Sequence, residues 1–87
     1  MDIEFDDAKD AANIAKHGVS LILGAAILQY PIGAVEDQRR PYGETRINAF
    51  GLIAGRLFVC TYTVRGTANR IISVRKASRQ EQRTWLS

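Results

Sequence analysis

The chain has 87 residues, of which 46% are hydrophobic and 24% charged, so it has room for a single domain with one core over residues 1–87. This composition excludes a disordered or membrane-spanning protein, and the one cysteine, Cys60, excludes an internal disulfide and favours a reducing compartment. Residues 1–44 carry eight acidic and four basic side chains, whereas residues 45–87 carry one acidic and eight basic, an asymmetry that favours a polyanionic partner such as nucleic acid.

The first predicted elements are a short strand over residues 2–5 and a helix that ends at His17. Asp6 is a typical N-cap, and further acidic residues follow in the first turn, where the helix dipole favours negative charge. Gly18 fits the left-handed C-cap with which many helices end. Ile14 and four alanines recur at helical spacing, so we expect this side of the helix to pack on the core.

A second helix is predicted from Ser20, which can serve as N-cap, to Tyr30, because Pro31 disfavours helical backbone in the residue before it. Within it, the run Leu21–Leu28 is apolar nearly all round but far short of the ~20 residues that span a bilayer. We expect a buried helix here. A strand is the alternative, and a partner protein could cover the excess apolar surface.

Residues 33–37 form a candidate edge strand, and three stronger strand signals follow a loop that holds Pro41 and Gly43. These strands are predicted over Thr45–Ile53, Arg56–Val64 and Asn69–Ala77. The dipeptide at 54–55 predicts a tight hairpin and residues 65–68 a longer one. Connections this short force antiparallel pairing.

The last of these strands contains the sequence RIISVRKA at positions 70–77. Strict alternation places Ile72 and Val74 on one side of the sheet. The residues of the opposite side are then Ile71, Ser73 and Arg75. The cations of this strand are either ordinary solvent-facing charges or are placed to bind a negatively charged group.

A closing helix is predicted after Ser78, with Glu81 at the third helical position completing a capping box and Trp85 as the anchor on the domain. The predicted order is β-α-α-β-β-β-α, an α+β fold. We expect an antiparallel sheet of three to four strands with the two N-terminal helices on one face. The other face can stay open to solvent, and the charges of the last three strands are expected there.

Few residues in this sequence can carry catalytic chemistry. There is one His and one Cys, with no HxxxH, CxxC or glycine-rich phosphate motif, so neither a metal nor a nucleotide cofactor is expected. Cys60 lies in mid-strand and is expected in the core. His17 is the side chain of this sequence whose unperturbed pKa lies near neutrality, so it is a candidate acid or base. Alternatively, it only complements the helix dipole at the C-terminal end of its helix.

These residues could cleave RNA without a metal ion. The reaction needs a base for the 2′-hydroxyl, an acid for the leaving 5′-oxygen and cations for the phosphate. His17 or Glu44 could supply the base, and arginine suits the phosphate because its planar fork makes bidentate contacts. This hypothesis requires cations gathered on one uncovered side of the domain, without acidic neighbours. Internal ion pairing is the alternative, and Arg39 and Arg40 are expected in solvent.

Four blocks of the sequence resemble the BrnT family of bacterial type II toxins: FDDAKDAANIAKHGVS, ED…YGETR, YTVRG and RIISVRKASRQEQR. They cover most of the chain in the family's order, and the pairing of KHGVS with RIISVRKA is the most specific part. The resemblance implies a RelE-like ribonuclease fold and a cytoplasmic toxin that cleaves RNA and arrests growth. It also implies a BrnA-type antitoxin that neutralises the toxin, with DNA contacted only through the antitoxin and no membrane involved.

Carried over residue by residue, the resemblance implies a candidate site. The catalytic candidates are His17, Glu44, Tyr62, Arg75 and Lys76. The RNA-binding candidates are Lys16, Arg46, Arg65, Arg70 and Arg79, and the YGETR block also holds Tyr42. Arg75 and Lys76 are expected to hold the phosphate. His17 and Glu44 are expected to act as acid and base, in either order.

The chain departs from the family pattern in two places. After HGVS the family continues Phe-Glu-Glu-Ala, whereas this chain has Leu21–Gly24, and the family's YTER is YTVR here, with Val64 replacing an acid. If that acid helps catalysis, the chain is a weakened nuclease. Two other classes of function stay open: a non-catalytic basic module that binds RNA, the ribosome or DNA, and a protein-interaction domain that docks through residues 21–28.

Overall fold

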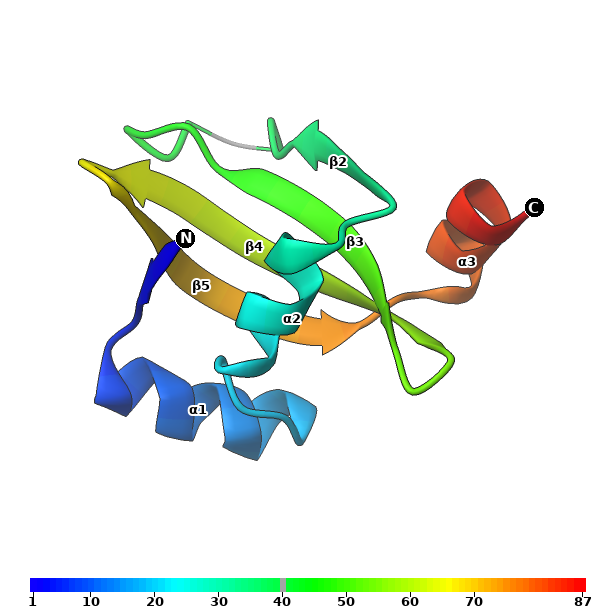
Figure 1. The fold of residues 1–87 in the computed structure, drawn as a ribbon, viewed down its shortest axis with the longest axis horizontal. Coiled ribbons are helices and arrows are strands. Elements are labelled where there is room, and N and C mark those ends of the chain that lie inside the picture. Colours follow the sequence, from blue (N-terminus) through cyan, green and yellow to red (C-terminus); the bar gives the residue numbers. More distant parts are fainter. Residues whose placement is uncertain (40) are drawn as a thin grey trace.

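The structure, a computed structural model, describes residues 1–39 and 41–87 (Figure 1). Its elements are β1 (Asp2–Glu4), α1 (Asp7–His17), α2 (Leu23–Gln29), β2 (Gly33–Glu36), β3 (Ile47–Ile53), β4 (Arg56–Arg65), β5 (Ala68–Lys76) and α3 (Arg79–Leu86). The predicted α+β class is confirmed. None of the helices in these residues is long and apolar enough to cross a membrane.

The five strands form one mixed sheet in the order β1-β5-β4-β3-β2. β1 pairs in parallel with β5, and the other neighbours are antiparallel. The predicted sheet of three to four antiparallel strands is therefore too small. The element order is β-α-α-β-β-β-β-α, with the candidate edge strand at 33–37 present as β2. β5 can take a parallel neighbour because most of the chain lies between β1 and β5 and makes the crossover.

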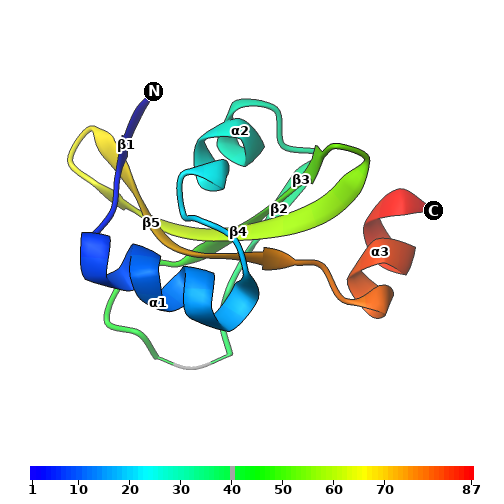
Figure 2. The same cartoon turned by 90° about the horizontal axis from the view of Figure 1, so that it is seen from below.

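α2 lies across one face of the sheet and fills the core beneath it (Figures 1 and 2). Leu21 and Ile27 are 0% and 1% exposed and pack with residues of β3, β4 and β5. The predicted buried helix is present, but its N-cap is Ile22 and not Ser20, so that Leu21 lies in the turn before it. Gly24 is needed here, because a Cβ would lie 3.0 Å from both Cys60 Sγ and Ile71 Cδ1. Cys60 is a core residue, as predicted, and burial raises the pKa of its thiol to about 12. The prediction that a partner docks through Leu21 is wrong, because this side chain lies inside the domain's own core.

A β-bulge between β4 and β5 changes which side chains of β5 reach this core. Ile71 and Ser73 pair with two consecutive residues of β4, which leaves Ile72 as the extra residue. Ile71 and Val74 consequently both pack in the α2 core, 1% and 0% exposed. The strict alternation predicted for this strand is therefore wrong for Ile71. It holds beyond the bulge, where Ser73 and Arg75 lie on the opposite face from Val74.

α3 packs on the other face of the sheet through one aromatic side chain. The ring of Trp85 stacks on Phe50, with 4.6 Å between the ring centroids. It also covers Gly33 of β2, where a Cβ would lie 2.1 Å from the Trp85 Cζ3 atom. The predicted anchor is confirmed, and so is the capping box that Ser78 and Glu81 form at the start of the helix.

α1 lies along the edge of β5 and not on the face that α2 covers (Figures 1 and 2). Its one buried side chain is Asn13, 6% exposed, whereas Ile14 is 47% exposed. The predictions that both N-terminal helices share one face, and that Ile14 marks the packed side, are therefore wrong. Polar contacts hold the helix instead: Asp10 accepts hydrogen bonds from Ser20 Oγ and the Leu21 N–H at 2.8 and 2.7 Å.

Asn13 completes the edge of β5 as a neighbouring strand would. Its Nδ2 donates to the carbonyls of Val19 and Val74 at 2.8 and 2.9 Å, and its Oδ1 accepts from the Val74 N–H at 3.2 Å. Asn13→Ala would leave both Val74 backbone groups buried without partners, so we expect the free energy of unfolding to fall by about 2–4 kcal/mol in urea denaturation. Asn69→Ala, at a half-buried position of β5, is the matched control. Equal losses in the two variants would contradict the role of Asn13.

Both long hairpins turn tightly. Ala54 and Gly55, between β3 and β4, have φ angles of 51° and 79°, the pattern of a two-residue hairpin, as predicted. Between β4 and β5, Arg65 pairs with Ala68 and Gly66 has a φ of 60°. The longer connection predicted there is therefore wrong.

Ala54 is strained, because a left-handed backbone costs a residue with a Cβ about 1–2 kcal/mol. Glycine removes this cost and forfeits about 0.5–1 kcal/mol through the greater entropy of the unfolded chain. We expect Ala54→Gly to raise the free energy of unfolding by about 0.5–1 kcal/mol, measured by urea denaturation. Gly55→Ala is the reciprocal change and should lower it. A destabilised Ala54→Gly variant would contradict the strain assigned here.

Candidate functional site

The face of the sheet opposite α2 is only partly covered and forms a shallow surface, here called the open face. In Figure 2 it is the lower side of the sheet, bordered by α1, by residues 37–39 and 41–46, and by α3. The side chains of Asn48 and Thr61 lie on it, because these residues alternate with Ala49 and Cys60 of the α2 core. Thr61 Oγ1 donates to Asn48 Oδ1 at 2.6 Å.

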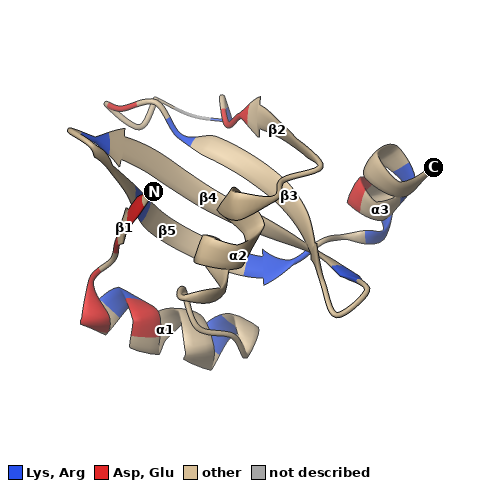
Figure 3. Ribbon diagram, viewed as in Figure 1, with Lys and Arg blue, Asp and Glu red and all other residues tan. Residues whose placement is uncertain are grey.

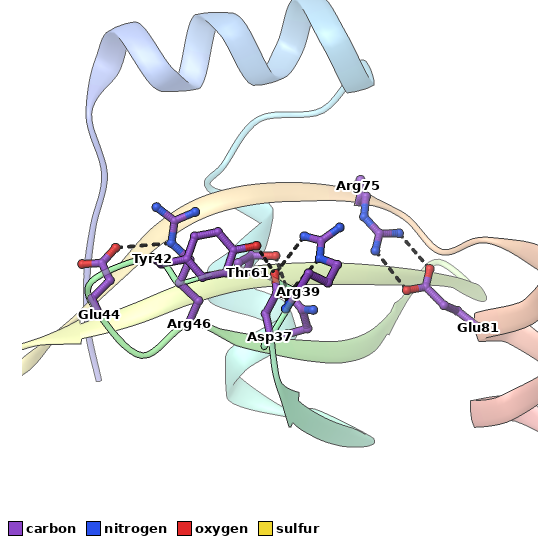
Figure 4. A network of polar contacts seen from close by, with 9 residues as sticks. Asp37, Arg39, Tyr42, Glu44, Arg46, Thr61, Arg75 and Glu81 are labelled. Carbon is purple, nitrogen blue, oxygen red and sulfur yellow. Dashed lines mark hydrogen bonds and ion pairs between the residues drawn. The ribbon is translucent and has the colours of Figure 1, made fainter.

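Arg75 is a firmly oriented cation of the open face. Its Nη1 and Nη2 atoms donate to the two carboxylate oxygens of Glu81 at 2.8 and 2.9 Å, and Nη1 also donates to the Lys76 carbonyl at 3.3 Å (Figure 4). The hydrogen bonds from Arg75 lower the pKa of Glu81 to about 2. Within residues 1–39 and 41–87, the Nε–H and the second Nη2–H of Arg75 have no partner. This edge of the guanidinium can hold two oxygens of one anion.

His17 lies at the C-terminal end of α1, on the side of Arg75. With Lys16, Ile72 and Ser73, among others, it lines a hollow of about 220 Å³. Ser73 lies two residues before Arg75 on the same face of β5. Burial lowers the pKa of His17 from 6.5, and the positive charges of Lys16 and Arg75 lower it further. The imidazole is therefore neutral at pH 7 and can accept a proton.

A buried carboxylate fixes the segment that borders the open face between β2 and β3. Asp37 is 6% exposed, and its two oxygens accept four hydrogen bonds, from the backbone and side chain of Arg39 and from Tyr42 Oη (Figure 4). The hydrogen bonds from the Arg39 side chain keep the pKa of Asp37 far below its usual range. Asp37 is therefore ionised, and it serves to hold Arg39 and Tyr42 in place.

Next to this carboxylate, Arg46 stacks on the ring of Tyr42. The Arg46 Cζ atom lies 4.1 Å from the ring centroid, and Nε donates to Glu44 Oε2 at 3.3 Å. Glu44 Oε1 lies 3.8 Å from Nη2 of Arg65. Figure 4 shows Glu44 and Arg46 at one end of a row of polar side chains and the Arg75–Glu81 pair at the other.

Most of the cations predicted to bind RNA lie beside acids. Four of them have a carboxylate at 2.8 to 3.9 Å: Arg46, Arg65, Arg70 and Arg75. The expectation of a cation cluster without acidic neighbours is therefore wrong. The acidic N-terminal half folds against the basic strands, so that Glu4 of β1, for example, lies 3.9 Å from Arg70 of β5.

The remaining predicted cations lie at two places. Lys76 and Arg79 stand at the junction of β5 and α3, where basic residues gather (Figure 3), and Lys16 stands beside His17. In the part of the chain that the structure describes, none of these three forms an ion pair. Arg39, expected in solvent, is 75% exposed but bound to Asp37, and the prediction for residue 40 lies outside the described residues.

Two predicted catalytic residues project away from the open face. Lys76 pairs with Phe58 and Tyr62 with Ile71, and these partners belong to the α2 core. Because directly paired residues of neighbouring strands share a face, Lys76 and Tyr62 lie on the α2 side of the sheet. The structure therefore separates Lys76 from Arg75, whereas His17 and Lys16 share a hollow with Ser73, two residues before Arg75.

The sequence offered little sign of the polar groups that organise this face. Asp37 belongs to the ED…YGETR block, but acids in polar loops are usually exposed, and nothing in the local pattern indicates burial. The pairing of Thr61 with Asn48 depends on the register of β3 and β4. The alternation of side chains within each strand would place Thr61 and Asn48 on the same face, and this pattern is the one signal in the sequence that could have predicted their proximity.

The sequence model of one protein family, described as ribonuclease toxin BrnT of type II toxin–antitoxin systems, matches residues 5–81. The matched segment contains His17, the Asp37–Arg39 pair, the Tyr42–Arg46 stack and the Arg75–Glu81 pair. No match was found among curated proteins. Because the family match spans most of the 87 residues, the chain belongs to the BrnT family of ribonuclease toxins of type II toxin–antitoxin systems.

Proposed function

We propose that this chain is an endoribonuclease toxin that cleaves RNA at the His17–Arg75 end of the open face by acid–base chemistry without a metal ion. The observation that carries the proposal is the hollow in which His17 and Lys16 lie beside Ser73, two residues before Arg75 on β5. Glu81 holds the Arg75 guanidinium and leaves its Nε–Nη2 edge unoccupied among the described residues. Membership of a ribonuclease family supports the reaction class.

In this mechanism His17 accepts the proton of a ribose 2′-hydroxyl, and the 2′-oxygen attacks the adjacent phosphorus. The bond from phosphorus to the 5′-oxygen breaks, and the 5′-oxygen takes a proton from water. The products are a 2′,3′-cyclic phosphate and a 5′-hydroxyl end. Arg75 donates to the non-bridging oxygens from Nε and Nη2, and Lys16 adds positive charge beside the attacking group.

The departures from the family pattern are compatible with this proposal. Val64 is 59% exposed and alternates along β4 with Thr63, which shares the open face with Thr61, so Val64 projects to the other side. Leu21 and Gly24 belong to the α2 core. Neither departure removes a group from the His17–Arg75 end of the open face.

The proposal includes a partner and a compartment. Family membership supports neutralisation by an antitoxin, and we propose that it is of the BrnA type and acts on this chain in the cytoplasm. Co-expression of the protein encoded directly downstream is expected to restore growth to cells that this chain arrests. Growth arrest that persists with that protein present would contradict this part of the proposal.

Incubation of the purified chain with a long single-stranded RNA, with and without EDTA, tests the activity. Gel electrophoresis and end analysis should reveal fragments with 2′,3′-cyclic phosphate ends, in equal yield under both conditions. Intact RNA, together with binding that weakens steeply with salt, would instead favour the non-catalytic RNA-binding alternative. Cleavage abolished by EDTA would overturn the metal-independent mechanism.

A further inference from the structure

We infer that Glu44, Arg46 and Tyr42 form a nucleobase subsite on the open face, which stacks one base of single-stranded RNA and prefers guanine. This rests on the proposed function, because RNA must lie along the open face to reach it. Glu44 then recognises a base and takes no part in proton transfer at the cleaved phosphate.

The position of Glu44 along the sheet separates it from the proposed cleavage centre. Glu44 lies beside Arg65, which pairs with Ala68, the first residue of β5. Arg75 pairs with Val59, which is six residues before Arg65 on β4, so Arg75 lies roughly 20 Å from this end at about 3.3 Å per residue. One phosphate cannot contact both ends, so an RNA strand bound at Arg75 must extend along the open face to reach Glu44.

Arg46 and Tyr42 provide a planar surface that exists before RNA binds. The two groups are stacked at 4.1 Å, and the Arg46 side chain is 24% exposed. Tyr42 Oη donates to the buried Asp37 at 3.0 Å, and Arg46 Nε donates to Glu44 at 3.3 Å. Because these bonds already hold the pair, a base that stacks on the outer face of the guanidinium meets a small ordering cost.

The charges here favour a base over a phosphate. Glu44 lies beside both Arg46 and Arg65, and the ionised Asp37 lies behind Tyr42. A phosphate would approach these carboxylates, which largely cancel the nearby positive charge. Stacking of a neutral base on a guanidinium needs a flat surface and does not require an excess of positive charge around it.

Glu44 determines which base fits. Its Oε2 accepts one hydrogen bond, and its Oε1 accepts none among the described residues, since the nearest Arg65 nitrogen lies 3.8 Å away. An ionised carboxylate only accepts hydrogen bonds. Guanine presents two neighbouring donors, N1–H and N2–H, on its Watson–Crick edge, whereas each other base also turns an acceptor toward the carboxylate.

Binding to uncleavable RNA measures this preference apart from cleavage. The probes are fluorescent 2′-O-methyl oligouridylates in which one central position is G, A, C or U, and anisotropy gives the dissociation constants. We expect the wild-type chain to bind the G probe about tenfold more tightly than the others. Glu44→Gln should abolish the preference, because an amide turns one donor toward guanine. Glu36→Gln, an exposed acid on β2, is the matched control and should retain it.

A second variant keeps the test informative if Glu44→Gln does not fold. Arg46→Lys keeps the charge but removes the planar guanidinium on which the base stacks, and should weaken binding of the G probe about tenfold. Equal binding of all four probes by the wild-type chain would overturn the subsite, and so would a guanine preference that survives in Glu44→Gln. Cleavage without base preference contradicts the subsite alone, whereas guanine preference without cleavage contradicts the proposed function alone.

Discussion

Replacement of His17 by Asn is expected to slow RNA cleavage by about 10²- to 10⁴-fold, the range for loss of a general base. Asn keeps a polar side chain at the end of α1 but cannot accept a proton near neutral pH. Initial rates on a fluorescent RNA measure the loss, and circular dichroism checks that the fold is retained. A variant that keeps about a tenth or more of the wild-type rate would contradict the role of His17.

The same role predicts the pH dependence of cleavage. Because burial and the charges of Lys16 and Arg75 lower the pKa of His17 from 6.5, the cleavage rate should rise as the pH passes this pKa. It should level off at a lower pH than an ordinary histidine would require. Lys16→Gln removes one of the charges that lower this pKa, so the midpoint of the profile should move upward. Arg56→Gln removes an exposed charge that does not act on His17 and should leave the midpoint unchanged.

Local signals in the sequence predicted the elements of this fold well. Asp6 and Gly18 cap α1 as expected, and Ser78 and Glu81 form the predicted capping box of α3. Each signal involves residues within a few positions of one another, where backbone geometry decides the outcome. The pairing of strands that are distant in the sequence, by contrast, could not be predicted from local patterns. The parallel contact of β1 with β5 joins segments at opposite ends of the chain.

The contacts within the candidate site could not be predicted from the sequence. Arg75 was expected to bind a negatively charged group, and its partner Glu81 was expected only as a helix cap. A single carboxylate does both, because the capping box requires Glu81 at the third position of α3, three residues after Ser78. Lys76, adjacent in sequence to Arg75, projects to the other face because side chains alternate along a strand.

Pairing with acids also changes what the arginines of the open face can contribute. Four predicted RNA-binding arginines have a carboxylate neighbour, so their net attraction for a polyanion is reduced. Arg46 and Arg75 also donate hydrogen bonds to their carboxylates, which fix one edge of each guanidinium and leave another for a ligand. We therefore expect orientation, more than accumulated charge, to determine how this face binds RNA.

Arg75→Gln provides the second large effect and tests this idea. Loss of an oriented donor to the phosphate is expected to lower the rate constant of cleavage by about 10²- to 10³-fold. Lys76→Gln is the matched control, because it removes the same charge from the adjacent residue on the opposite face, and should change the rate only slightly. Single-turnover rates at saturating protein measure both. Equal losses in the two variants would mean that charge, wherever it stands, accounts for the effect.

Glu81→Gln distinguishes orientation from charge at Arg75 itself. Gln can still complete the capping box, so α3 should keep its first turn while the carboxylate charge is lost. If Glu81 orients Arg75, removing the charge should tighten RNA binding, which lowers KM, and slow the cleavage step, which lowers kcat. If Arg75 contributed only positive charge, its release from Glu81 would raise kcat as well. The opposite movements of affinity and rate in this one variant are therefore the result that the Arg75–Glu81 geometry requires.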